Sequence, residues 1–358
     1  MKVCCIVETV FQMINALNLL MFDDDFKGTE IDLFVRKDHF SNSTKYSEKI
    51  RETGYFHEIN YFNFSEYSSS NLVNHLKHIP ELFFAKNEIS KAVGNGYKFK
   101  ADSYDVLLTP NGCQFFKLAM VCCNNANIYC YEDGTLSYSN KNWISNEVSE
   151  LSKKVLGILG KGDRILPSRV YLNNPELYTS TWNAEIKALP QLKGTMLENR
   201  DLFFNIFGDS ICDYNNNKII YCAQPSPVPD DISIDICNGI KQEHICRYHP
   251  RNEKSLVLNG LQDRGSSQWE LICADCITDN HILIGACSSA QVSSKWFFDK
   301  EPYVIFTYPI YGNKVPAEFV EVSKSIVETT RGIYKNPEKV IVVKTIEELN
   351  NAINSIVE

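Results

Sequence analysis

The chain has 358 residues, of which 44% are hydrophobic and 22% are charged, a composition typical of a globular protein rather than a disordered or fibrous one. Its length exceeds the roughly 250–300 residues over which a single hydrophobic core usually extends, so we expect two domains. The formal net charge of −8 argues against a nucleic-acid-binding protein, which would need a basic surface.

The N-terminal segment predicts a strand followed by a helix. Residues 3–7 form a short apolar run typical of a buried strand, and Thr9 then stands where a helix cap belongs. Apolar side chains follow at helical spacing, namely Phe11, Ile14, Leu17 and Leu20. Polar residues such as Glu8 and Gln12 interrupt this segment, so it does not have the pattern of a signal peptide. No run of about 18 apolar residues occurs, and no transmembrane helix is expected.

Three more strands are predicted in the first half, at 31–35, 104–108 and 126–131, with a helix at about 113–123 between the last two. The strand at 126–131 ends in the acidic turn Glu132-Asp133-Gly134. Strands that alternate with helices predict parallel β-α-β units. The segment 173–210 is more polar, and we place the domain boundary within it, between residues 178 and 179.

The second half repeats the pattern, with strands at 218–222, 245–248, 282–286 and 303–306 and helices at 232–240 and 345–357. Asp230 is the predicted cap of the first of these helices. We therefore predict an α/β protein with two doubly wound, Rossmann-like domains, 1–178 and 179–358. Ligands of such sheets bind beyond the carboxyl ends of the strands.

Polar residues stand at several of these strand ends. In the second half they form three clusters, which are Asp230-Asp231 after the loop Gln224-Pro225, then His249-Pro250-Arg251, and Ser288-Ser289. An imidazole beside a guanidinium suits a phosphate group, and a serine-capped helix N-terminus is a favourable anion site. Each cluster also has an ordinary structural explanation as a helix cap or a turn.

The sequence predicts no metal site. Cys273 and Cys276 form a C-x-x-C pair, but no second pair follows at zinc spacing. The thirteen cysteines are an odd number, and so many thiols favour the reducing cytosol. Basic residues cluster at 153–169, either as a solvated helix face or as a patch that contacts anionic lipid or an anionic acceptor.

Taken together, these residues resemble the bacterial sialyltransferases, most closely glycosyltransferase family 52. VETVFQ at 7–12 is similar to the family's TPFQ start, with Val10 in place of the usual proline. EDGTLSY at 132–138 is similar to its acidic D/E-D-G motif. Gln224-Pro225, His249-Pro250 and Ser288-Ser289 are similar to its QP loop, HP motif and paired-hydroxyl motif. The loop after Gln224-Pro225 is longer and richer in proline than the family pattern.

The resemblance implies the GT-B architecture, in which two Rossmann-like domains face each other across a cleft, with the acceptor on the N-terminal and the nucleotide-sugar donor on the C-terminal domain. It implies inverting transfer of sialic acid from CMP-sialic acid to a terminal sugar, often galactose, of lipooligosaccharide or capsule. A CMP-sugar carries a single bridging phosphate, so no metal cofactor is expected. A cytoplasmic location, peripheral contact with the inner membrane face and a homodimer are compatible with it.

The resemblance also assigns roles to site residues. The general base is one of three aspartates, Asp230, Asp231 or Asp133, and this choice stays open. The donor site would comprise Gln224, Pro225, His249, Pro250, Arg251, Ser288 and Ser289, of which His249 and the two serines stabilise charge on the departing phosphate.

Two alternatives remain beside the sialyltransferase. The first is a transferase of the same family that uses a UDP-hexose. The second is a non-catalytic protein that binds a nucleotide or a glycan. A Rossmann-type oxidoreductase is disfavoured because no G-x-G-x-x-G follows the first strand.

Overall fold

The computed structural model describes residues 1–37, 43–64, 79–138, 148, 150–178, 183–208, 213–225, 227–249, 257–263 and 267–357. The chain divides into two compact units, Met1–Thr195 and Met196–Glu358. The site residues Pro250 and Arg251 lie outside the described residues, so the structure does not test them.

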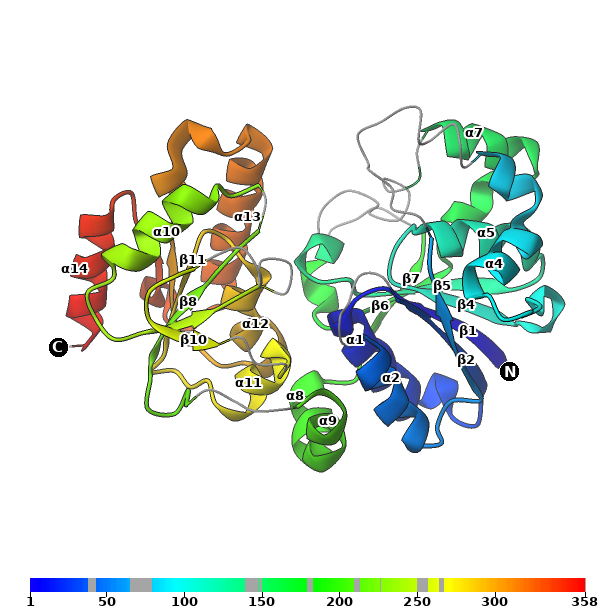
Figure 1. Cartoon of the computed structure of the whole chain (residues 1–358), viewed down its shortest axis with the longest axis horizontal. Helices are drawn as coiled ribbons and strands as arrows, with labels where there is room; N and C mark the ends of the chain where they lie inside the picture. The colour runs from blue at the N-terminus through cyan, green and yellow to red at the C-terminus, as the bar shows by residue number, and fades with distance from the viewer. Residues whose placement is uncertain are drawn as a thin grey trace. The chain divides into compact units, whose positions relative to one another are not determined.

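The first unit is built on a parallel sheet of seven strands (Figure 1). They are β1 (Lys2–Val7), β2 (Glu30–Arg36), β3 (Glu58–Phe62), β4 (Val106–Thr109), β5 (Asn127–Tyr131), β6 (Arg169–Leu172) and β7 (Glu185–Ala188). Their order is β3-β2-β1-β4-β5-β6-β7, so the direction of winding reverses between β1 and β4. Five of the six residues of β1 are fully buried, because helices cover both faces of this sheet.

The helices of the first unit are α1 (Val10–Phe22), α2 (Ser43–Glu52), α4 (Ala85–Val93), α5 (Gln114–Cys122) and α7 (Glu150–Ile158). Helices α1 and α2 lie on one face of the sheet, and α4, α5 and α7 lie on the other (Figure 1). Short 3-10 turns complete the unit, namely η1 (Asp24–Phe26), η2 (Ala101–Ser103), η3 (Thr135–Tyr138), η4 (Gly162–Ile165) and η5 (Pro175–Leu177). Helix α8 (Leu192–Glu198) contains the division between the units.

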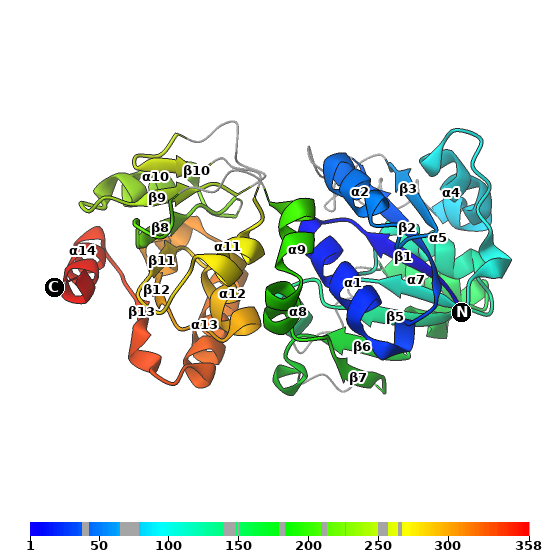
Figure 2. The same ribbon diagram turned by 90° about the horizontal axis from the view of Figure 1, so that it is seen from below.

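The second unit has a parallel sheet of six strands (Figure 2). They are β8 (Ile219–Cys222), β9 (Ile245–Arg247), β10 (Leu261–Asp263), β11 (Ile282–Gly285), β12 (Tyr303–Phe306) and β13 (Val340–Val342), in the order β10-β9-β8-β11-β12-β13. The helices are α9 (Arg200–Phe207), α10 (Asp230–Gly239), α11 (Trp269–Asp275), α12 (Ser289–Phe298), α13 (Ala317–Ile333) and α14 (Ile346–Val357), with 3-10 turns η6 (Tyr308–Lys314) and η7 (Pro337–Lys339). The winding reverses between β8 and β11.

The predicted fold class is confirmed, since both units are doubly wound parallel α/β domains. The boundary differs from the predicted one between residues 178 and 179. Strand β7 pairs with β6 at the edge of the first sheet, so the first unit extends to Thr195. The sequence did not reveal β7 because its four residues are partly or fully exposed and form no apolar run. No helix in the described parts of the chain is long and apolar enough to span a membrane.

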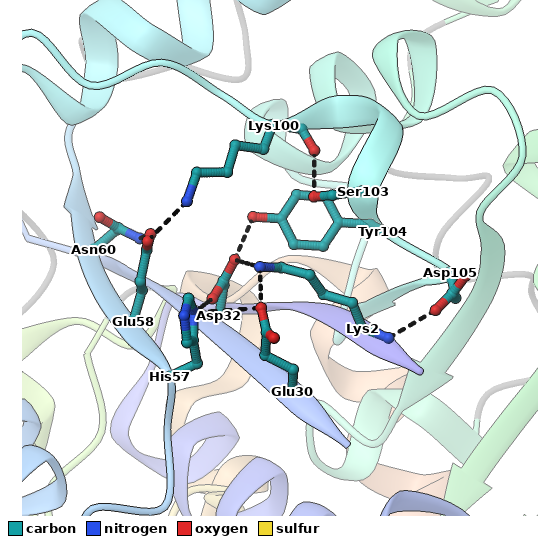
Figure 3. Close-up of polar contacts among 10 residues, drawn as sticks. All are labelled: Lys2, Glu30, Asp32, His57, Glu58, Asn60, Lys100, Ser103, Tyr104 and Asp105. Carbon is teal, nitrogen blue, oxygen red and sulfur yellow. Dashed lines mark hydrogen bonds and ion pairs between the residues drawn. The ribbon is translucent and has the colours of Figure 1, made fainter.

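A polar cluster around Asp32 holds the amino ends of the first sheet together (Figure 3). The buried Asp32 carboxylate accepts a 2.8 Å hydrogen bond from the hydroxyl of Tyr104, lies 2.7 Å from Nδ1 of His57, and pairs with Nζ of Lys2 at 3.2 Å. Burial lowers the pKa of Lys2, but its hydrogen bonds to Glu30 and Asp32 raise it overall. The cluster therefore contains its own cation, and it lies at the sheet edge opposite to the one where ligands of such folds bind.

Candidate functional site

One candidate site lies in the first unit and begins where β1 ends. Thr9 caps α1 by accepting a 3.1 Å hydrogen bond from the backbone N–H of Gln12, which confirms the predicted cap. The side-chain oxygen of Gln12 in turn accepts from the backbone N–H groups of Glu8, at 2.7 Å, and Thr9, at 3.0 Å. This capping box fixes the orientation of the Gln12 amide, and its NH2 group points away from the helix terminus.

The NH2 group of Gln12 donates a hydrogen bond to Asp133. The carboxylate of Asp133 follows β5 and accepts hydrogen bonds from Nε2 of Gln12 and, at 3.3 Å, from Nδ2 of Asn111. Its backbone N–H donates to the hydroxyl of Ser137 at 2.9 Å, and Gly134 next to it has φ +107°, which closes the turn. The three strands β1, β4 and β5 thus bring this cluster to the carboxyl edge, beside the point where the winding reverses.

The environment of Asp133 makes it a stronger proton acceptor than an ordinary aspartate. Burial raises its pKa to about 6, against the opposing effect of the hydrogen bonds from Gln12 and Asn111, and the nearby Glu8 raises it further. The residue as a whole is half-buried. A carboxylate with a pKa near the working pH is suited to general base catalysis.

Glu8 extends the same cluster. One oxygen of its carboxylate accepts a 3.0 Å hydrogen bond from Arg36, at the end of β2, and the other accepts a 3.3 Å hydrogen bond from Nδ2 of Asn111. The amide of Asn111 therefore bridges two carboxylates, those of Glu8 and Asp133. The charge of Glu8 is compensated by Arg36.

Glu132 has a structural position beside Asp133. It is fully buried, and one of its oxygens accepts from the hydroxyl of Tyr138 and from the backbone and side-chain N–H groups of Asn173, at 2.8 and 3.0 Å. The other oxygen has no hydrogen-bond partner among the described residues. Burial raises the pKa of Glu132 to about 7. Because the carboxylate is inaccessible, it orders the acidic turn rather than meeting a substrate.

A second candidate site lies in the second unit, between β8 and β11. The side-chain oxygen of Gln224, after β8, accepts a 2.9 Å hydrogen bond from the backbone N–H of Cys287, after β11. Ser288 caps α12, because its hydroxyl accepts from the N–H of Ala290 at 3.3 Å, and Gln291 completes the capping box. The structure thus brings Gln224 and Ser288 together at the carboxyl edge. Ser289 is exposed beside them, and Pro225 follows Gln224.

His249 follows β9, which pairs with β8, and its side chain is partly exposed. Its predicted neighbours Pro250 and Arg251 are outside the described residues. His249 therefore stands at the same carboxyl edge as Gln224 and Ser288, one strand further along the sheet.

Asp230 and Asp231 occupy the first turn of α10, and both are exposed. The predicted cap is wrong by one residue: Pro229 stands at the N-cap, and Asp230 is the first helical residue. Asp231 lies 3.4 Å from the ammonium of Lys314. Its pKa is lowered by a hydrogen bond from the backbone of Ile232 and by Lys314, so it is a weak proton acceptor.

Sequence reasoning did not assign Glu8, Gln12, Arg36 or Asn111 to the site. Glu8 and Gln12 belong to the VETVFQ segment that carried part of the resemblance, and Asn111 stands in the turn after a predicted strand. Arg36 is the last residue of β2, and the other three residues follow the carboxyl ends of β1 or β4. Their position at strand ends was the one feature of the sequence that could have indicated a site.

No protein-family model matches the chain, and no curated protein matches it. Several solved structures are similar to the chain. Arabidopsis thaliana UGT89C1 complexed with UDP-L-rhamnose is similar at 9% identity and a TM-score of 0.51, over 98% of this chain and 89% of that one. The glycosyltransferase VinC in complex with DTDP is similar at 9% identity and a TM-score of 0.50, over 100% and 91%. At this identity the likeness shows the fold alone, which is of the GT-B type with two Rossmann-like α/β domains.

Proposed function

We propose that the chain is a nucleotide-sugar-dependent glycosyltransferase in which Asp133 is the general base. The observation that carries this proposal is the Asp133 carboxylate, held by Gln12 and Asn111 at the carboxyl edge of the first sheet with a pKa raised to about 6. A base of this pKa is largely deprotonated near neutral pH and still accepts a proton from a hydroxyl whose acidity rises in the transition state.

Asp133 is favoured over the other two candidates by its surroundings. Asp230 and Asp231 are exposed in a helix first turn, where carboxylates commonly stabilise the helix dipole, and the pKa of Asp231 is lowered. Asp133 has two fixed amide donors that define where its oxygens point. Catalytic carboxylates need such positioning, because small displacements of a base reduce the rate strongly.

The donor site is assigned to the second unit. The N-terminus of α12, capped by Ser288, offers backbone N–H groups to an anion, and Ser289 adds an exposed hydroxyl. His249 supplies an imidazole at the same sheet edge. These residues suit the single phosphate of a CMP-sugar. With the resemblance of five motifs to family 52, they support CMP-sialic acid as donor, without a catalytic metal.

In the proposed reaction, a hydroxyl of a terminal galactose on a bacterial surface glycan attacks the anomeric carbon of the donor.

 Asp133 takes the hydroxyl proton as the new carbon–oxygen bond forms. The bond between the anomeric carbon and the phosphate oxygen breaks on the opposite side, so the configuration inverts. CMP leaves with the bonding electron pair, and the N–H groups at the start of α12 together with His249 stabilise its charge.

The basic segment 153–169 supports only a limited membrane contact. Arg164 donates to the backbone carbonyls of Cys123 and Ala126, at 2.7 and 2.5 Å, and Arg169 pairs with Asp25 and Glu185, so both serve the fold. The remaining cations are Lys153, Lys154 and Lys161. Ile158 is 81% exposed near them and gives the segment an apolar contact point. We propose peripheral contact with the inner face of the membrane through this segment, in a cytoplasmic enzyme that forms a homodimer.

The experiment is an assay of CMP release from CMP-sialic acid with and without lactose, with no added divalent metal. The proposal expects lactose-dependent release and a sialylated product of inverted configuration. A matched assay with UDP-hexoses tests the alternative donor, which the UDP-L-rhamnose bound to UGT89C1 also suggests. Release from a UDP-sugar alone would retain the transferase and replace the donor. Tight nucleotide binding without turnover on either donor would contradict an enzyme and favour a binding protein.

A further inference from the structure

Three metal-ligating side chains meet in the second unit, away from the proposed donor site. Cys237 belongs to the last turn of α10, His244 directly precedes β9, and Cys246 lies within β9. Their exposed fractions are 0%, 3% and 0%. The Sγ atom of Cys237 is 3.2 Å from Sγ of Cys246 and 3.4 Å from Nε2 of His244, and the three ligand atoms all lie within 4.8 Å of one another.

The imidazole of His244 is oriented as a metal ligand would be. Its Nδ1 lies 2.8 Å from the backbone carbonyl oxygen of Gln242, which can only accept, so Nδ1 carries the proton and donates. The lone pair of Nε2 then points toward the two sulfurs. Histidines that bind metals usually donate their other ring N–H to a carbonyl or carboxylate in this manner.

The backbone of Asn259 and Gly260 packs closely against these atoms. A Cβ at Gly260 would lie 2.9 Å from Nε2 of His244 and 2.7 Å from its carbonyl oxygen, so only glycine fits there. Gly260 also has φ +103°, a conformation that other residues rarely adopt. The carbonyl oxygen of Asn259 accepts from both thiols, 2.5 Å from Sγ of Cys246 and 3.4 Å from Sγ of Cys237, so it faces the same cluster.

These distances are close to those of a tetrahedral zinc site. Two thiolates at ~2.3 Å from one Zn²⁺ lie about 3.8 Å apart, and a thiolate and an imidazole nitrogen lie about 3.6 Å apart. The observed separations of 3.2 and 3.4 Å need only a small opening to reach these values. The Asn259 oxygen would move away from Sγ of Cys246 by about 1 Å to take the fourth position. The cluster is part of an apolar core, where two thiols and an imidazole would otherwise be poorly solvated.

We propose that Cys237, His244 and Cys246 bind one structural Zn²⁺ ion, with the carbonyl oxygen of Asn259 at the fourth position. On binding, the two thiols lose their protons to solvent and the thiolates balance the charge of the ion. The ion would tie α10 and the 257–260 segment to β9. Because β9 leads directly to His249, the site would also fix the start of a strand that carries a proposed donor-site residue.

The sequence predicted no metal site. The ligand spacing, C-x6-H-x-C, contains no C-x-x-C pair, so it lacks the usual sequence signature of zinc. The true C-x-x-C pair, Cys273 and Cys276, belongs to no group of metal-ligating atoms among the described residues. The site is structural rather than catalytic because all three side chains are buried, and it leaves the proposed transfer reaction independent of an added metal.

The test is metal analysis of the full-length protein, purified without chelators, followed by replacement of the metal with Co²⁺. We expect one zinc per chain, and for the cobalt protein the visible bands and thiolate-to-metal absorption of a tetrahedral site with two cysteines. Cys246→Ser should reduce the bound metal from one equivalent to near zero. Cys273→Ser removes an equally buried thiol of the same unit, outside the cluster, and should retain the full equivalent.

Two results would overturn the proposal. One is a protein that contains no zinc and gives no thiolate-to-cobalt absorption after reduction and reconstitution. The other is a disulfide between Cys237 and Cys246 in the natively purified protein, identified by mass spectrometry of peptides. If Cys246→Ser does not fold, the cobalt spectrum of the wild-type protein decides alone, because it reports the ligands directly.

Discussion

The side-chain amide of Gln12 donates a hydrogen bond to the carboxylate of Asp133, across 121 residues of sequence. The capping box at the start of α1 holds the oxygen end of that amide, so its NH2 end can only face Asp133. One glutamine therefore connects the first helix of the chain with the proposed base, and several expectations rest on this contact.

The first prediction concerns the pH dependence of turnover. The hydrogen bond from Gln12 lowers the pKa of Asp133, which burial raises to about 6. We expect kcat/KM of the wild type to rise with pH through an apparent pKa near 6, as the base loses its proton. Gln12→Met removes the donor at similar volume, so the acid limb should move to higher pH. Thr9→Ala weakens the same helix cap without contacting Asp133, and it should leave the pH profile in place.

The second prediction concerns stability and Glu132. Its pKa is raised from 4.5 to about 7 in the folded protein, so its contribution to stability falls as pH rises from the unfolded to the folded value and stays low above pH 7. Glu132→Gln is neutral at every pH. Between pH 4 and pH 8, its free energy of unfolding relative to the wild type should rise by at most about 3 kcal/mol, as measured by urea unfolding. Glu150→Gln is the control, because it changes an exposed glutamate whose pKa is lowered by Lys153. If this variant also became more stable relative to the wild type as pH rises, the effect would have a cause other than burial.

The third prediction separates the two serines at the start of α12. Ser288→Ala removes the cap and should lower the free energy of unfolding by about 1 kcal/mol. Ser289→Ala removes an exposed hydroxyl that does not cap the helix, so the melting temperature should not change. If the phosphate binds here, Ser289→Ala should weaken nucleotide binding about tenfold, as measured by calorimetry. Unchanged affinity in both variants would place the phosphate elsewhere.

The fourth prediction concerns the tight packing of the backbone where the winding of the second sheet reverses, between β8 and β11. A Cβ at Gly285 would lie 2.9 Å from the carbonyl oxygen of Cys222 and 3.0 Å from Oε1 of Gln291, both buried beside the proposed donor site. We expect Gly285→Ala to destabilise the protein by about 1–3 kcal/mol. A Cβ at Gly332, in α13, meets nothing within 4 Å, and Gly332→Ala should stabilise by about 0.5–1 kcal/mol. Thermal unfolding of the two variants compares them directly.

The strands of the second unit show what an apolar run can predict. Strand β12 has the predicted bounds, and β8, β9 and β11 differ from theirs by one residue, because buried parallel strands are continuously apolar. Edge strands lack this signal: β3 and β7 are mostly half-exposed, and neither was predicted. The missed β7 explains why the predicted boundary came too early.

The site was predictable only in part. The apolar runs correctly placed Asp133, Gln224 and Ser288 after strand ends, and their proposed roles stay predictions. The choice among the aspartates was not predictable, because it depends on burial and on amide donors from distant elements. The Cys237–His244–Cys246 cluster was equally hidden, since it needs the end of α10 to pack against β9.

The most direct test of the account is turnover and nucleotide affinity of Asp133→Asn, with Asp231→Asn as the matched variant. Asparagine keeps the shape of the side chain and removes the base. The account predicts that Asp133→Asn lowers kcat by roughly 10²–10⁴-fold with unchanged affinity for CMP, while Asp231→Asn keeps nearly full turnover. Full activity of Asp133→Asn, or a comparable loss in Asp231→Asn alone, would contradict the assignment of Asp133 as the general base.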